Sequence, residues 1–228
     1  MRIGLIADVH SNLQAFRAVL EDMPKLDRII CAGDLVGYAT EPNEVVNLAK
    51  SKRLLAVMGN HDYAALTRDV RGFNPIAAEA AVWTADKLTP ENVKFLSNLP
   101  DRLELKLGGY RIYVVHGSPR DPLGEYVFPE IPNHELARIV QDLDADVIVL
   151  GHTHVPMKRM ILGKLVINPG GVGQPRDRDP RASYAILTIG KKIEVDHRRV
   201  EYDPKKTAEK IKAAGLPEEL AARLFFGW

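Results

Sequence analysis

The chain has 228 residues, of which 46% are hydrophobic and 27% are charged. This is the composition of a globular protein, and it excludes an intrinsically disordered chain. Lysine and arginine (31) almost balance aspartate and glutamate (30), so the net charge of +1 gives no global attraction to nucleic acid.

The first half of the chain alternates short hydrophobic runs with amphipathic segments. Ile3–Ala7 is a predicted strand, too short and too soon followed by a charge for a signal peptide. A helix with one buried face should follow, because Leu13, Phe16, Leu20 and Met23 recur at steps of three and four residues. Further strands are predicted at Arg28–Ala32 and Leu54–Met58, and further helices at Glu44–Lys50, after Asn74-Pro75 and after Thr89-Pro90.

The second half changes to paired strands. Leu103, Leu105 and Leu107 alternate with charged residues, and Gly108-Gly109 turns the chain back into Tyr110–Val115, which predicts a hairpin. Further hairpins are predicted at Ile161–Ile167 and Tyr184–Val195, a strand at Asp146–Leu150, and helices from Asn133 to Leu143 and on both sides of Gly215-Leu216-Pro217. Together the two halves predict an α/β protein with two mixed sheets and helices outside them.

Nothing in the middle of the chain marks a domain boundary. We therefore predict a single domain over residues 1–228, with a C-terminal helical extension at about 204–228. No hydrophobic run approaches the roughly 20 residues of a membrane span, so we expect a cytoplasmic protein without membrane contact. The apolar end Leu224–Trp228 should dock on its own chain, and a homodimer is the alternative.

Five short segments follow predicted strands and combine Asp, Asn or His with a small residue. They are Asp8-Val9-His10, Gly33-Asp34, Gly59-Asn60-His61-Asp62, His116-Gly117 and Gly151-His152-Thr153-His154. Ligand sites in α/β folds lie at the carboxyl ends of strands, so these segments should meet in one cleft. Five of the seven histidines fall in them, whereas His134 and His197 are expected to be structural or solvated.

The donor types in these segments suit a metal cluster. Imidazole and carboxylate together bind Mn, Fe, Ni or Zn. In an extended chain, residues two apart point the same way, so Asp8 with His10, and His152 with His154, should each present two ligands. The candidates are Asp8, His10, Asp34, Asn60, His116, His152 and His154. Seven donors are too many for one four-coordinate ion and suit two ions that share a carboxylate, for which Asp34 is the candidate.

The order of the five segments resembles the calcineurin-like metallophosphoesterase superfamily, and within it the small prokaryotic phosphodiesterases. The motifs span residues 8–154, and Asn168–Arg176 extends the match. The resemblance implies a four-layer α/β/β/α sandwich. It also implies one metal on Asp8, His10, Asp34 and His154, and another on Asp34, Asn60, His116 and His152. It says little about the residues after about Val200.

A pair of divalent ions predicts a mechanism. Two ions about 3.5–4 Å apart can hold a bridging hydroxide that attacks phosphorus in line. His61 neighbours Asn60 but points differently in an extended chain, so it should face the substrate. The resemblance implies that His61 stabilises the developing charge or protonates the leaving group. Asp62 either orients His61 or caps a helix.

The glycine-containing loop that ends in Arg176 suggests a phosphate contact. Glycines let backbone N–H groups approach an anion, and arginine binds phosphate with two parallel hydrogen bonds. We therefore take Arg176 as a candidate substrate-binding residue. The alternative is a flexible surface turn.

These features predict a metal-dependent hydrolase acting on a small phosphate ester. Phosphodiesters are the expected substrates, with phosphomonoesters or nucleotides as alternatives. Two divalent ions are the expected cofactors, with Mn favoured over Ni, Fe, Zn or Mg. One rival is a nuclease, which the near-neutral charge disfavours. The other is a non-catalytic, metal-binding scaffold for protein interaction, which is disfavoured because no ligand position is missing.

Overall fold

The computed structural model describes residues 1–228 and contains two five-stranded sheets. The first sheet has the strand order β10-β9-β1-β2-β3. Its strands are β1 (Arg2–Ile6), β2 (Arg28–Cys31), β3 (Leu55–Ala56), β9 (Ala182–Ile189) and β10 (Ile193–Val200). The first three strands are parallel, and β9 and β10 continue the sheet in antiparallel pairing.

The second sheet has the strand order β4-β5-β6-β8-β7. Its strands are β4 (Arg102–Leu107), β5 (Tyr110–Val115), β6 (Val147–Val149), β7 (Met157–Ile161) and β8 (Lys164–Asn168). The three inner strands β5, β6 and β8 are parallel, and β4 and β7 pair antiparallel at the edges. Both sheets are therefore mixed, as predicted.

Several of the eight helices begin where the sequence offers a capping side chain. The helices are α1 (Leu13–Asp22), α2 (Pro42–Ser51), α3 (Asn60–Thr67), α4 (Pro75–Lys87), α5 (Pro90–Ser97), α6 (Asn133–Val140), α7 (Pro204–Ala213) and α8 (Glu218–Ala222), with a 3₁₀ turn η1 (Arg223–Phe225) after α8. The side chains of Asn12, Asn74 and Thr89 accept N–H bonds from the first turns of α1, α4 and α5.

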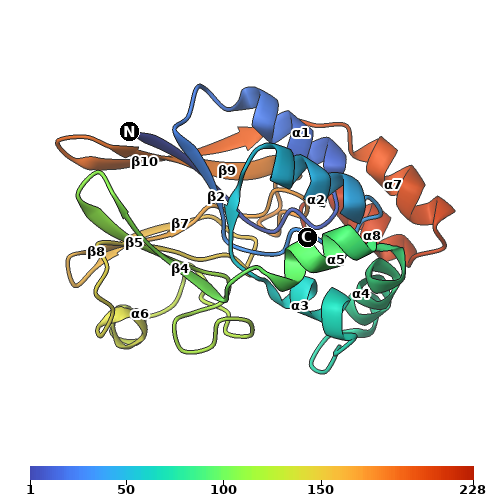
Figure 1. Ribbon diagram of the computed structural model, residues 1–228, viewed down its shortest axis with the longest axis horizontal. Helices are drawn as coiled ribbons and strands as arrows, with labels where there is room; N and C mark the ends of the chain where they lie inside the picture. Colours follow the sequence, from blue (N-terminus) through green and yellow to red (C-terminus); the bar gives the residue numbers. More distant parts are fainter.

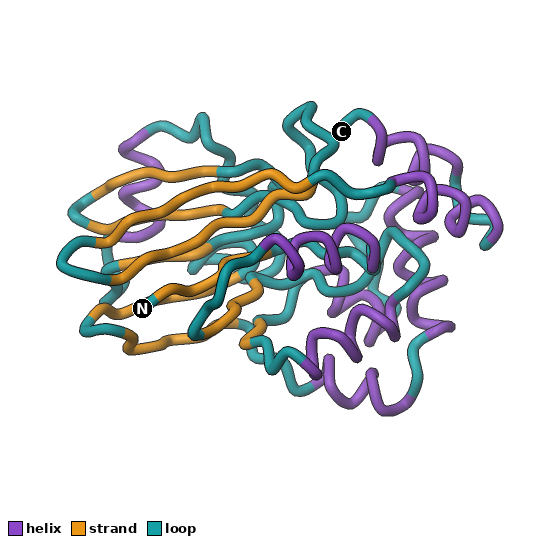
Figure 2. Tube along the Cα trace, turned by 90° about the horizontal axis from the view of Figure 1, so that it is seen from above, coloured by secondary structure: helices purple, strands orange, loops and turns teal.

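The hydrophobic core is arranged in layers (Figure 1). The two sheets pack face to face through residues such as Leu5 and Val114. Helices α1 and α2 cover the outer face of the first sheet through Phe16 and Val46, and α6 covers the outer face of the second through Leu136. This is the predicted α/β/β/α sandwich. Figure 2 shows the other helices at one end of the molecule, with loops between them and the strands.

Some local predictions were wrong. No helix was predicted at α3, because Asn60-His61-Asp62 carries no hydrophobic periodicity. The strand at Leu54–Met58 is only the two residues of β3, since the N–H of Met58 leaves the sheet to bond Pro100 O. The first arm of the β7–β8 hairpin begins at Met157, four residues earlier than predicted.

The C-terminal extension folds as the two short helices predicted for it, α7 and α8. Its end docks in part on the chain itself: Leu224 is buried, whereas Phe226 and Trp228 are exposed. The single domain and the homodimer alternative both stay predictions. No helix of the protein has the length and hydrophobicity that crossing a bilayer would require.

Candidate metal centre

The loops that follow β1, β2, β5, β6 and β8 are joined by main-chain hydrogen bonds. The N–H groups of Asp8 and His10 donate to the carbonyls of Gly33 and Asp34, both at 3.0 Å. From the loops after β6 and β8, Gly151 N–H donates to His116 O at 2.8 Å and Gly173 N–H to Asp8 O at 2.9 Å. The two sheets therefore present their strand ends to one shared space.

All seven predicted ligand side chains lie in that space. Donor atoms of Asp8, His10 and His154 lie within 4.8 Å of one another, and so do those of Asp34, His116 and His152. Asp34 lies between the two groups, with its Oδ2 3.6 Å from His10 Nε2 and 3.3 Å from His116 Nε2. The seventh, Asn60, has its Oδ1 3.0 Å from His116 Nε2. The structure thus brings together residues up to 146 positions apart in the sequence.

The other two histidines lie apart from this group. His134 is exposed on α6. His197 on β10 has its Nε2 2.9 Å from the carbonyl of Asn168. Both have the structural or solvated character expected of them.

In the first group, two imidazole nitrogens face each other without a proton between them. His10 Nδ1 lies 3.1 Å from the carbonyl of Val36, and His154 Nδ1 lies against the carbonyl of Gln174. A carbonyl accepts only, so each Nδ1 must carry the proton, and each Nε2 is left with a lone pair. The two Nε2 atoms lie 3.1 Å apart. Two lone pairs at this distance repel unless a cation accepts both.

In the second group, His116 Nδ1 lies 2.8 Å from the carbonyl of Ala32, which points His116 Nε2 toward His152 Nδ1 at 3.1 Å. The buried Oδ2 atoms of Asp8 and Asp34 have no hydrogen-bond partner. Buried polar atoms without partners are rare and costly, so the two groups fit divalent cations as their missing partners.

The electrostatic environment in the chain by itself leaves most of these donor atoms without a proton, so that they can bind a cation. Burial lowers the pKa of His10 and His154 well below the ordinary value, and that of His152 to about 3. These imidazoles are therefore neutral at pH 7. Burial also raises the pKa of Asp8 to about 7.

Asp34 and His116 form a charged pair within the group. Burial opposes both charges, but the charge of the partner outweighs it. The pKa of Asp34 falls below its usual range, and the pKa of His116 rises to about 9. His116 must therefore lose a proton before it can bind a cation.

The backbone at these positions is left-handed, not extended. Asp8, His10, Asp34, His152 and His154 all have φ between 50° and 67°. Such conformations cost about 1–3 kcal/mol each and collect at functional sites. The extended-chain argument for Asp8 with His10 and for His152 with His154 was therefore wrong. Sharp turns at the strand ends bring these side chains together instead.

His61 lies beside both groups, on the first turn of α3. The main-chain N–H of His61 donates to Asp34 Oδ1 at 2.9 Å. The ring centroid of His61 lies 4.8 Å from that of His10, and the ring atom Nδ1 has no hydrogen-bond partner. Its orientation comes from the helix and not from an extended chain. Burial lowers the pKa of His61 to about 4.

Asp62 caps a helix and does not orient His61. Its two oxygens accept the N–H groups of Val36 and Gly59, both at 3.0 Å. The bond to Gly59 closes the start of α3, and the bond to Val36 ties the helix to the loop after β2. Of the two interpretations of Asp62, the cap holds.

Arg176 lies on a packed loop. A Cβ atom on Gly173 of this loop would lie 1.9 Å from Val9 O, so the alternative of a flexible surface turn was wrong. The Arg176 guanidinium donates to Tyr38 Oη at 3.0 Å and to Gln174 Oε1 at 3.1 Å. The sequence did not indicate Tyr38, because no spacing rule marks it. Its ring centroid lies 4.6 Å from that of His10 and 4.3 Å from that of His61.

A cavity of about 390 Å³ opens beside the two groups and includes Asn60, His61 and His152 in its wall. Its wall also includes the aromatic rings of Tyr38, Tyr63, Phe73 and Tyr126, together with the charged residues Asp69, Arg71 and Asp121. The ring of Tyr126 stacks on His152 at 3.8 Å. The cavity thus places aromatic rings next to the candidate metal ligands.

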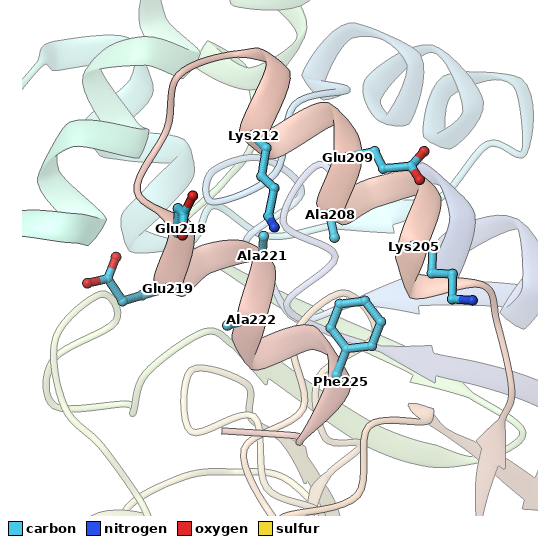
Figure 3. Close-up of a pocket in the computed structure, with 9 residues that line it drawn as sticks. All are labelled: Lys205, Ala208, Glu209, Lys212, Glu218, Glu219, Ala221, Ala222 and Phe225. Carbon is cyan, nitrogen blue, oxygen red and sulfur yellow. The ribbon is translucent and has the colours of Figure 1, made fainter.

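A larger hollow, of about 710 Å³, lies between α7 and α8 (Figure 3). Its lining mixes lysines and glutamates such as Lys212 and Glu218 with the ring of Phe225. No histidine and none of the predicted site residues line it.

Comparison with known proteins agrees with this geometry. Residues 1–192 match the model of the calcineurin-like phosphoesterase superfamily domain. An uncharacterized protein of Methanocaldococcus jannaschii is 39% identical over 99% of this chain and 98% of its own length. A probable metallophosphoesterase of the same organism is 26% identical over 85% of this chain and 79% of its own.

A solved structure extends the likeness to three dimensions. The metallophosphoesterase of Sphaerobacter thermophilus superimposes with a TM-score of 0.88 at 39% identity, covering 100% of this chain and 99% of its own. The chain therefore belongs to the calcineurin-like phosphoesterase superfamily and is a metal-dependent phosphoesterase.

Proposed function

We propose that the chain hydrolyses phosphodiesters at a centre of two divalent metal ions, with Mn favoured. The proposed ligands are Asp8, His10, Asp34 and His154 for one ion, and Asp34, Asn60, His116 and His152 for the other. The observation that carries the proposal is the pair of facing Nε2 lone pairs of His10 and His154, beside the buried Oδ2 atoms of Asp8 and Asp34 that have no hydrogen-bond partner. Oxygen and imidazole donors without a thiolate suit Mn.

When bound, such a pair of ions lowers the pKa of water to about 7 and offsets the charge of the phosphate. The residues of the chain then position the substrate and neutralise its charge. His61, neutral in the chain by itself, offers one N–H to a phosphoryl or leaving-group oxygen. Arg176 binds a non-bridging phosphate oxygen, because its guanidinium donates to Tyr38 Oη and Tyr38 lines the cavity. The aromatic walls take the leaving group.

The direct test is a metal and substrate panel. The protein, stripped of ions with a chelator, is assayed with Mn, Ni, Mg and Zn in turn on bis-p-nitrophenyl phosphate and p-nitrophenyl phosphate. We expect metal-dependent hydrolysis with the diester preferred. The variant Asp34→Asn should lose both metal and activity, whereas the control His134→Ala on exposed α6 should lose neither.

One outcome of this panel decides against the proposal: protein that takes up metal but hydrolyses neither ester would be the non-catalytic scaffold. Separately, an Arg176→Ala variant with an unchanged Michaelis constant for every ester would remove Arg176 from the substrate site.

A further inference from the structure

The C-terminal extension contributes a second arginine at the edge of the site. Arg223 lies on η1, beyond the residues 1–192 that match the family model. Its neighbour Leu224 is buried in a cluster with Tyr38, which fixes η1 against the loop after β2. Figure 1 shows α7 and α8 at the same end of the molecule as α3 and α4.

Arg176 and Arg223 converge on one neutral oxygen. Gln174 Oε1 accepts from Arg176 Nη2 at 3.1 Å and from Arg223 Nη1 at 3.2 Å. Both guanidinium carbons also lie near the Tyr38 ring, at 5.7 Å and 5.8 Å from its centroid. Two half-buried cations that share a single acceptor repel each other.

No salt bridge joins either guanidinium to a carboxylate of the chain, and Glu219 acts on Arg223 only through its charge. The acidic residues that follow Arg176 in the sequence are paired elsewhere, Asp177 with Arg199 and Asp179 with Arg181. The only hydrogen-bond acceptors of the two guanidiniums are Gln174 Oε1 and Tyr38 Oη. Several N–H donors of each arginine are therefore free for an anion.

Gln174 and Tyr38, which contact the arginine pair, also contact the candidate metal ligands. The carbonyl of Gln174 faces His154 Nδ1, and the Tyr38 ring that lies near both guanidiniums also packs against His10 and His61. Because Arg176 and Arg223 share Gln174 Oε1, an anion on Arg223 would lie next to a phosphate that Arg176 contacts.

We propose that Arg223 binds a second, non-scissile phosphate of the substrate, beside the scissile phosphate that Arg176 contacts. The preferred substrate class is then a phosphate ester with a further phosphate adjacent to the scissile one, such as an ester of a nucleoside diphosphate. This inference rests on the proposed function, because the scissile phosphate must lie at the metal centre.

The test compares two esters that differ by one phosphate, the p-nitrophenyl esters of thymidine monophosphate and thymidine diphosphate. Both release p-nitrophenol, so one assay follows them. The wild type should prefer the diphosphate ester. The variant Arg223→Gln should lower kcat/KM for that ester about tenfold to hundredfold, mainly through KM, because a charge-assisted hydrogen bond is lost. The monophosphate ester should change less than about twofold.

Matched controls separate binding from folding. Arg181→Gln removes an arginine already paired with Asp179 and should change neither ester. Arg223→Lys keeps the charge and should retain part of the diphosphate preference. Competitive inhibition by thymidine diphosphate should weaken in Arg223→Gln, while inhibition by thymidine monophosphate should not.

Equal loss on both esters in Arg223→Gln, or no loss on either, overturns the role of Arg223. A wild type that hydrolyses the two esters with equal kcat/KM also overturns it. The same holds for an Arg223→Gln variant in which only inhibition by inorganic phosphate is weakened. A wild type that hydrolyses bis-p-nitrophenyl phosphate but neither thymidine ester would refute the substrate class alone. If it hydrolyses none of these esters with any metal, the proposed function itself fails.

Discussion

At the scale of single residues, the site is organised by where each histidine keeps its proton. His10, His116 and His154 each direct Nδ1 to a main-chain carbonyl, so the opposite nitrogen faces the other donors. Carbonyl partners of this kind fix the tautomer and orientation of metal-binding histidines. The sequence shows the residue types at these positions, but the carbonyl partners depend on how the loops fold.

Substitution of His61 should affect catalysis without affecting metal binding. His61→Ala should lower kcat on bis-p-nitrophenyl phosphate by roughly 10²–10⁴-fold, because it removes an N–H donor that acts on the reacting phosphate. Metal content, measured by plasma emission spectroscopy, should be unchanged. The structure makes this test necessary, because donor atoms of His61, His10 and Asp34 lie within 4.8 Å of one another. Loss of metal in step with activity would make His61 a ligand.

Metal affinity should rise with pH. Because the pKa of His116 in the chain by itself is raised to about 9, a cation must displace its proton at any lower pH. Affinity for Mn should therefore increase about tenfold per pH unit between pH 7 and 9. Below pH 7 the slope should steepen, because Asp8, with a pKa of about 7, also holds a proton.

Calorimetric titrations in two buffers with different ionisation enthalpies measure this effect. At pH 8 we expect the release of about one proton per chain. Affinity that does not change with pH would show that His116 is already neutral before the metal arrives.

At the scale of elements, strand ends that turn sharply bring the donors together. Asp8, Asp34 and His152 adopt left-handed backbone at the ends of β1, β2 and β6. The motifs predicted the correct cluster from strand-end topology, which needs only the order of the elements. The local geometry could not be predicted, because left-handed backbone at non-glycine residues is stabilised by the tertiary bonds between loops.

Gly59 allows α3 to start directly against Asp34. A Cβ atom there would lie 2.0 Å from Asp34 Oδ1 and 2.4 Å from Asp34 N. Gly59→Ala should displace Asp34 and lower both metal occupancy and the free energy of unfolding, the latter by about 1–3 kcal/mol or more.

Denaturant unfolding and metal analysis of the Gly59→Ala protein check this. Gly190→Ala is the matched control, because the nearest atom to its Cβ would be Lys192 O at 3.8 Å. A Gly59→Ala variant that behaves like this control would show that the helix start tolerates a side chain.

At the scale of the whole molecule, the sequence predicted what depends on pattern and order. Alternating and helical periodicities gave both mixed sheets and most helices, and strand-end motifs gave seven side chains that do meet. Tyr38 and Arg223 could not be predicted, because their place depends on how α8 and η1 dock on the loop after β2. Arg223 is also 47 residues beyond Arg176, with no local signal that links them.

Crystals grown with Mn would show whether two metal ions share Asp34. Anomalous scattering should show two peaks per chain, about 3.5–4 Å apart. One should lie among Asp8, His10 and His154, the other among Asn60, His116 and His152, and Asp34 should contact both. A single peak, or two peaks of which Asp34 contacts only one, would rule out a shared Asp34.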